Sequence, residues 1–132
     1  MSFCFDTSHF HFFIVLSKGM DSHTFYGAFH VLLVAPLLLW VGMKRDVPDW
    51  TYTLLLVLGA GIFAYHAFRA WGKVAAGKSA WVNWIHILLV APMFLVIGWN
   101  GKETPRRFFE ILVMLGFAAL GYHSYHMIEE LM

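Results

Sequence analysis

Two near-identical stretches of this sequence place a histidine inside an apolar run. Residues 30–36 read HVLLVAP and residues 86–92 read HILLVAP. Neutral imidazole is the commonest metal ligand in proteins, and it also exchanges protons near neutral pH. Ionisable groups are costly in hydrocarbon, so a functional role is their default interpretation there. His30 and His86 are therefore the first candidates for a functional site.

The two stretches belong to a longer internal repeat, which brings in a second pair of histidines. Positions 30–42 and 86–98 share a His, Leu, Leu, Val, Ala, Pro, Leu and Gly in one register. A shift of 57 residues (66 to 123) adds identities in the rest of each repeat: Leu58 and Leu115, Gly59 and Gly116, Tyr65 and Tyr122, His66 and His123. We therefore expect a duplicated two-helix hairpin.

The elements that carry these histidines are four apolar segments, at about 25–43, 51–71, 81–99 and 108–128. Hydrophobic residues make up 60% of the 132 residues and charged residues 13%, whereas soluble domains are nearer half and a quarter. Each segment is close to the ~20 residues that cross a ~30 Å hydrocarbon core as a helix. The sequence predicts an all-α, multi-pass integral membrane four-helix bundle in contact with a lipid bilayer.

The domain organisation follows from these segments. We expect a single transmembrane domain over residues 21–132, with repeats at about 25–71 and 81–128. Two identical hairpins insert with the same orientation, so a pseudo-twofold axis should run along the membrane normal and both termini should lie on one side. Residues 1–20 are expected to be an interfacial or disordered extension, because their apolar run is too short to span.

Composition also excludes several classes of protein. Cys4 is the only cysteine, which excludes an intramolecular disulfide and a cysteine-based metal centre. The net charge is +1 and no basic run is present, so nucleic acid is not an expected partner. The motifs of soluble hydrolases, nucleotide-binding proteins and zinc proteases are absent, and no catalytic residue is assigned.

The four histidines of the repeats are expected to lie at one depth. Each is about five residues inside its segment, and successive segments alternate in direction. At 1.5 Å per residue this places all of them roughly 7–9 Å below the same membrane surface. Polar groups in a membrane turn toward the bundle interior. We therefore predict an intramembrane metal or cofactor site formed by His30, His66, His86 and His123.

Haem b is the first hypothesis for the bound group. The histidines of the second and fourth segments lie among Gly and Ala residues, which leave room for a flat macrocycle. The residues expected to contact it are Gly59, Tyr65, Arg69, Gly116, Tyr122 and His126. Arg69 lies one turn beyond His66, where haem propionates would meet a cation.

This layout resembles the transmembrane b-type cytochromes, in which two histidines from different helices of a bundle hold a haem. The resemblance implies electron transfer, and with it a redox partner protein. The chain departs from that family in one respect. Those proteins commonly stack two haems at different depths, whereas these histidines share one depth, so only one diagonal pair would be used.

A bare transition-metal ion is the second hypothesis. Four histidines around one axis could hold Cu, Zn or Fe, and His126, one turn from His123, could be a fifth ligand or a hydrogen-bond partner. A non-functional interpretation competes with both, in which the imidazoles only make interhelical hydrogen bonds beside Tyr65 and Tyr122. The pattern is also compatible with a homo-oligomer.

Two further functions remain open on the sequence alone. A ring of titratable imidazoles could form a proton or ion channel or a transporter, although the segments carry no acidic relay below the histidine level. The chain could also be a non-catalytic pigment-binding or assembly subunit, because histidine ligates the magnesium of chlorophyll-type pigments. Pro36 and Pro92 each remove a helix hydrogen bond, and we expect them to kink the first and third helices.

Overall fold

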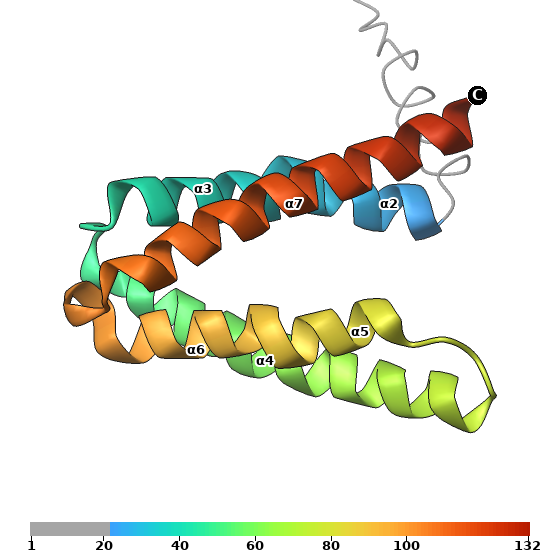
Figure 1. Cartoon of the computed structure of the whole chain (residues 1–132), viewed down its shortest axis with the longest axis horizontal. Coiled ribbons are helices and arrows are strands. Elements are labelled where there is room, and N and C mark those ends of the chain that lie inside the picture. Colours follow the sequence, from blue (N-terminus) through green and yellow to red (C-terminus); the bar gives the residue numbers. More distant parts are fainter. Residues whose placement is uncertain (1–21) are drawn as a thin grey trace, which may run out of the picture.

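The structure is a computed structural model that describes residues 22–132, and within this range the secondary structure is helical. The extension expected at residues 1–20 lies outside the described residues. Four long helices follow one another, two of them interrupted by a π-helical turn (Figure 1). Their parts are α2 (Ser22–Phe29), η1 (His30–Val34), α3 (Ala35–Lys44), α4 (Asp49–Ala75), α5 (Trp81–Ile85), η2 (His86–Val90), α6 (Ala91–Asn100), η3 (Gly101–Glu103) and α7 (Arg106–Leu131).

The four predicted segments are confirmed as helices, and the all-α prediction is confirmed for the described residues. The second and fourth helices are longer than predicted, because they extend beyond their apolar stretches into polar residues. Pro48 precedes α4 and Pro105 precedes α7, where the missing N–H of proline costs nothing. All four helices are long and apolar enough to cross a membrane: Ser22–Lys44, Asp49–Ala75, Trp81–Glu103 and Arg106–Leu131.

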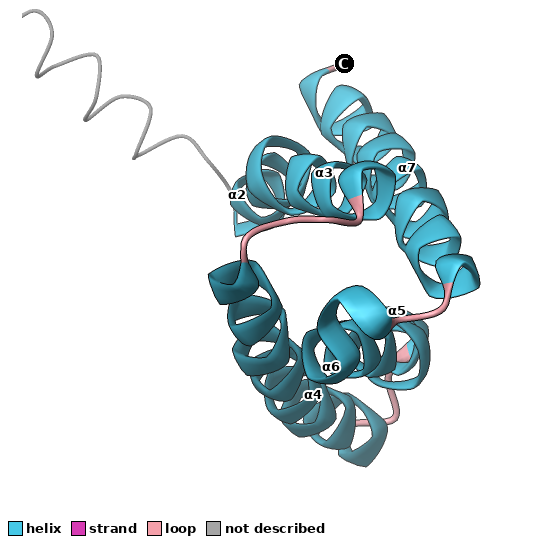
Figure 2. Cartoon of the chain, turned by 90° about the vertical axis from the view of Figure 1, so that its left-hand side faces the viewer, coloured by secondary structure: helices cyan, strands magenta, loops and turns pink. Residues whose placement is uncertain are grey.

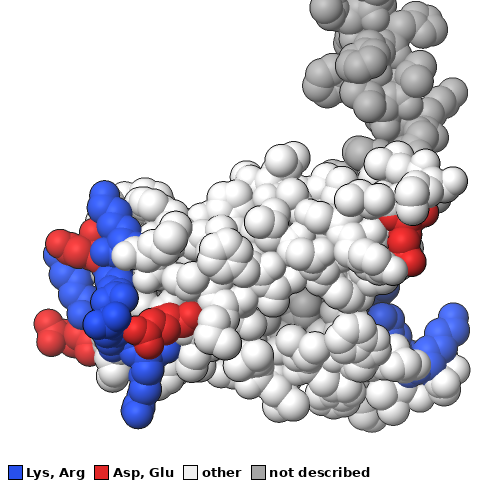
Figure 3. All heavy atoms as spheres, turned by 45° about the horizontal axis from the view of Figure 1, so that its top comes forward, with Lys and Arg blue, Asp and Glu red and all other residues white. Residues whose placement is uncertain are grey.

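The outer surface of the helices is apolar. Large hydrophobic side chains such as Leu32, Leu88 and Phe68 are more than two thirds exposed. On the face drawn in Figure 3, charged side chains gather at the two ends and leave an uncharged band between them. An apolar band flanked by charged ends matches the profile of a bilayer. These features suggest a multi-pass integral membrane protein.

The helices form two antiparallel pairs. α3 packs along α7, and α4 packs along α6, and Figures 1 and 2 show these two pairs as two layers that face one another. Each layer therefore joins a helix from one half of the chain to a helix from the other half. The expected duplication and its pseudo-twofold axis stay predictions.

The start of α2 and the end of α7 lie at the same end of the molecule (Figure 1). There the Thr24 hydroxyl donates a hydrogen bond of 2.7 Å to the Glu130 carboxylate. The connection between α4 and α5 lies at this end too. The opposite end carries the connections from α3 to α4 and from α6 to α7, and there Lys102 bridges Asp46 and Asp49 at 3.3 and 3.8 Å.

The core lies toward the end formed by these two connections. Its buried side chains come from all four helices and the first connection: Leu38, Val41, Val47, Tyr52, Leu55, Phe94, Ile97, Phe109 and Leu112. Two glycines bring the backbones together here. A Cβ on Gly98 would lie 2.6 Å from the Leu56 nitrogen, and one on Gly42 would lie 2.9 Å from the Phe109 carbonyl oxygen.

The prolines act through π-helical turns. Pro36 and Pro92 have no N–H for the carbonyl four residues earlier, and their rings crowd it. The helices widen by one turn just before each proline, where the Ala35 N–H bonds the His30 carbonyl and the Ala91 N–H bonds the His86 carbonyl. Such turns are rare and often lie at functional sites. The chain thus continues as a helix through both prolines.

The π-helical turn changes the position of His30 relative to the core-facing residues of the first helix. Ordinary α-helical spacing predicts that His30 shares a stripe with Val34, Leu37 and Val41. An α-helix would place His30 above Val34, whereas the wider turn places it above Ala35, which is fully buried. The core-facing residues that follow are Leu38 and Val41. In α4, which has no such turn, the stripe that α-helical spacing predicts from His66 is confirmed: Leu55 and Gly59 are buried and Ile62 packs against the core.

Candidate functional site

The four histidines of the repeats lie side by side. The rings of His30 and His123 are stacked with centroids 4.2 Å apart, and those of His66 and His86 are stacked at 4.0 Å. His30 and His86 meet edge to face at 6.1 Å, which links the two pairs. Each stacked pair joins the two helices of one layer, and the edge contact joins the layers. The imidazoles therefore adjoin in the order His123, His30, His86, His66.

Three of the imidazoles are anchored through Nδ1. In His30 this atom donates to the Tyr26 carbonyl at 2.7 Å, and in His86 it donates to the Val82 carbonyl at 2.7 Å. A carbonyl oxygen can only accept, so Nδ1 carries the proton in both rings and Nε2 keeps its lone pair. A ligating histidine is usually held in the same way, with its other ring nitrogen bonded to a carbonyl or carboxylate.

The third anchor is a side chain that the sequence analysis overlooked. His66 Nδ1 lies 3.0 Å from the Oδ1 atom of Asn83, which is 5% exposed at the start of α5. The Nδ2 atom of the same amide is buried without a hydrogen-bond partner. Asn83 is the only amide in the apolar segment 81–99. Its polar side chain in that segment was the available signal.

The expected four-ligand ion site is not preformed. Among residues 22–132, no group of three or more His, Cys, Asp or Glu side chains is arranged to hold a metal ion. The stacking accounts for this, because the lone pair of an imidazole lies in the ring plane. Two parallel rings on top of one another, such as His66 and His86, direct their lone pairs along parallel lines and not toward a common point.

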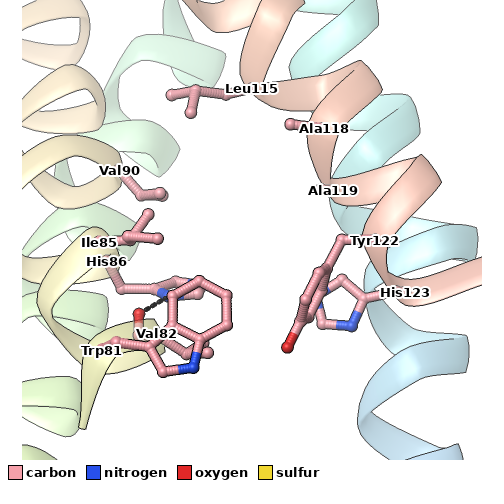
Figure 4. Close-up of a pocket in the computed structure, with 10 residues that line it drawn as sticks. All are labelled: Trp81, Val82, Ile85, His86, Val90, Leu115, Ala118, Ala119, Tyr122 and His123. Atoms are coloured by element: carbon pink, nitrogen blue, oxygen red, sulfur yellow. Dashed lines mark hydrogen bonds between the residues drawn. The ribbon is translucent and has the colours of Figure 1, made fainter. Parts of the chain in front are cut away.

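A cavity of about 200 Å³ lies between α5, η2 and α7. His86 and His123 are on its facing walls, and Ala118 and Ala119 leave it room on the α7 side (Figure 4). The remaining lining is almost entirely apolar. Trp81 and Tyr122 meet edge to face across it, with ring centroids 5.9 Å apart. His30 and His66 do not line this cavity.

The residues predicted to contact a cofactor fall into different surroundings. Tyr122 lines the cavity. Gly59 and Gly116 do not face open space, because Leu95 and Leu39 pack directly against them. These two glycines serve close helix packing in this structure.

The other predicted contacts lie on the outside of the helices. Arg69 and Tyr65 are exposed on α4, and Tyr65 touches the edge of His66. His126 is exposed and pairs with Glu129 at 3.3 Å, while its ring contacts Tyr122. Leu32 and Leu88, each four residues before a proline, have outward-facing side chains. The structure therefore does not bring His126 or Arg69 into the row of adjoining imidazoles formed by His123, His30, His86 and His66.

The cavity matches haem b in its donor atoms and is small for it in volume. Two imidazoles from different helices on facing apolar walls are the donor set of an axially ligated haem b. Its volume of about 200 Å³ is smaller than the roughly 300–1,000 Å³ of most cofactor sites. The donors therefore fit, whereas the whole macrocycle fits only if α5 and α7 lie farther apart.

Comparisons with known protein families, curated proteins and solved structures found no match.

Proposed function

We propose that this membrane protein binds haem b, or else a transition-metal ion, at its intramembrane histidines and serves electron transfer. The observation that supports this most is that His86 and His123, from different helices, lie on facing walls of one apolar cavity. The Nδ1 atom of His86 is bonded to the Val82 carbonyl, which leaves its Nε2 lone pair available. The neighbouring His30 and His66 are also bonded through Nδ1, so their Nε2 atoms are available too. Ordinary interhelical hydrogen bonding would use these atoms, and no such bond between histidines is present among the described residues.

Haem b is favoured over a bare ion because it needs two axial histidines and not a converging set of three or four. His86 and His123 are on facing walls of one cavity, whereas no group of three or more possible ligands converges among residues 22–132. When bound, haem would supply a one-electron redox centre. The protein itself would orient the two rings and exclude water through the apolar walls, with Ala118 and Ala119 making room.

The proton-channel alternative gains little from the geometry. Proton transfer between imidazoles requires an N–H of one ring to point at a nitrogen of the next. The pairs His30–His123 and His66–His86 are instead stacked face on face. Their polar atoms are therefore not aligned along the contact.

The deciding experiment is an absorption spectrum of the full chain, purified from haem-replete membranes and recorded oxidised and reduced. We expect a Soret band that shifts on reduction, and its loss in His86→Ala and His123→Ala. His23→Ala is the matched control, since His23 is exposed on α2 and is not one of the four adjoining imidazoles. A Soret-free protein that contains iron, copper or zinc would favour the bare ion. A colourless, metal-free protein would overturn the proposal.

A further inference from the structure

The four histidines differ in what they face. His86 and His123 line the cavity, whereas the other two lie behind them. His66 is stacked on His86 with an interplanar angle of 14°, and His30 is stacked on His123 with an angle of 22°. Each cavity-lining ring is therefore covered on one side by a second imidazole. Four equivalent ligands would not divide in this way.

We propose that His30 and His66 are positioning residues which hold His123 and His86 in place, and that Asn83 fixes the orientation of His66. This inference rests on the proposed function insofar as His86 and His123 are the ligands. It assigns a task to the pair that a single haem leaves unused. A backing ring limits rotation of the ligand about its side-chain bonds, which preserves the aim of Nε2 into the cavity.

Asn83 is the reason to regard this arrangement as functional. An amide in an apolar segment is costly, and the unpartnered Nδ2 atom makes this one costlier than an apolar side chain of the same size. Its Oδ1 atom is the acceptor for His66 Nδ1. The amide therefore occupies a position where stability alone favours leucine, and its hydrogen bond orients the ring that backs His86.

The two halves of the chain differ at this point. The repeat register pairs Asn83 with Gly27 (83 minus 56), and His66 with His123. Gly27 has no side chain and lies against Met127. The amide therefore serves one half only. We expect Asn83 to hold His66, the ring that backs His86, in a single tautomer. Substitution of Asn83 can test this.

The first test needs no cofactor. Nitrogen-15 NMR of histidine-labelled full chain in lipid nanodiscs reports which ring nitrogen carries the proton. We expect His66 to be the Nδ1–H tautomer, Asn83→Leu to convert it to a mixture with the Nε2–H form, and Asn83→Asp to restore it, because a carboxylate also accepts. Asn100→Leu removes an exposed amide that bonds Val96 and should change nothing. An unchanged His66 tautomer in Asn83→Leu would overturn the anchoring.

The second test separates ligands from backing rings. Phenylalanine keeps a flat ring for stacking but has no lone pair. We expect His66→Phe and His30→Phe to retain haem, with affinity changed less than about 10-fold and a shifted reduction potential, whereas His86→Phe and His123→Phe lose the Soret band. Outer partners of metal ligands typically contribute about 10–100-fold in affinity, which sets the expectation for His66→Ala.

The outcomes distinguish this inference from the proposed function. If His66→Phe loses haem as completely as His86→Phe, His66 is itself a ligand and the division of roles is wrong. If the wild-type chain binds no haem or metal, the proposed function fails and the ligand-backing role fails with it. The tautomer measurement on the cofactor-free chain still decides whether Asn83 anchors His66.

Discussion

The two ends of the helix bundle are built differently. At the end of the connections α3–α4 and α6–α7, nine buried side chains form a continuous core, and glycines bring helix backbones into contact. At the histidine end, the cluster of buried hydrophobic residues in the described part of the chain consists of Ala70, Ala80 and Ile87, and a cavity lies between α5 and α7. The end of the connections is therefore packed like a protein interior, whereas the histidine end contains unfilled space between its helices.

This contrast indicates a division between stability and function. Without a hydrophobic driving force between helices in lipid, association depends on close van der Waals packing at small residues. Gly42 and Gly98 supply that packing far from the imidazoles. The histidine end can then be loosely packed while the four helices stay together through their contacts at the other end.

The largest effect is expected from Gly98→Leu at the packed end. Its side chain would collide with the backbone of α4 at Leu56 and Tyr52, which cannot move aside as a flexible side chain can. We expect a loss of about 3 kcal/mol or more in the free energy of unfolding, measured by denaturation in detergent. Gly61→Leu is the control, since its neighbourhood is open. Equal stability of the two variants would remove the distinction between the ends.

Filling the cavity should affect binding and not stability. Ala118→Leu places a larger apolar side chain in the space between His86 and His123. We expect haem affinity to fall by at least about 10-fold, or about 1.4 kcal/mol, with the unfolding free energy unchanged within about 1 kcal/mol. Ala60→Leu, on the exposed side of α4, should leave both quantities unchanged. Strong destabilisation by Ala118→Leu would mean that this end is packed as tightly as the other.

A hydrogen bond at the packed end provides a smaller test. The Tyr52 hydroxyl, in a residue 5% exposed, donates to the Arg45 carbonyl at 2.5 Å. Arg45 has a positive φ of 60°, a conformation that needs support from its surroundings. Tyr52→Phe should lower the unfolding free energy by about 1 kcal/mol. Tyr125→Phe removes an exposed bond to Glu129, and an equal cost in that variant would contradict the expected role of burial.

The smallest expected effect is a gain. Gly121 lies in α7 near the histidine end, and a Cβ added there would meet no atom of another element within 4 Å. Gly121→Ala should raise the unfolding free energy by roughly 0.5–1 kcal/mol, because alanine loses less backbone entropy in a helix. Gly42→Ala makes the same exchange against the backbone of α7 and should lower stability instead. Thermal denaturation of both variants gives the two signs, and a gain in Gly42→Ala would contradict the close contact.

Much of the fold was predictable because it depends on composition and length. The apolar runs and the charged connections determined four helices, and the α4 stripe through Leu55 and Gly59 followed from helical periodicity. The position of His30 relative to the core did not follow. A π-helical turn changes the period over a few residues only, and no sequence count distinguishes it from an ordinary proline kink.

The candidate site was predictable in its members and not in its arrangement. Spacing and alternating direction bring His30, His66, His86 and His123 together, but ring stacking depends on side-chain torsions that no pattern encodes. The repeat alone does not show which two histidines differ from the others. The differences between them depend on the cavity between α5 and α7 and on Asn83, which has no counterpart in the first half.

Each π-helical turn changes the angular relation between the two parts of the helix that contains it. Each turn shifts the helical phase by about one residue, or roughly 100°. The helix is continuous through the turn. The side chains after Val34 are nevertheless rotated about the helix axis, relative to those before His30, from where an uninterrupted α-helix would place them. The direction of the face that carries the imidazole and the direction of the face that packs against the neighbouring helix are therefore set independently. A substitution can change one direction while the other stays the same.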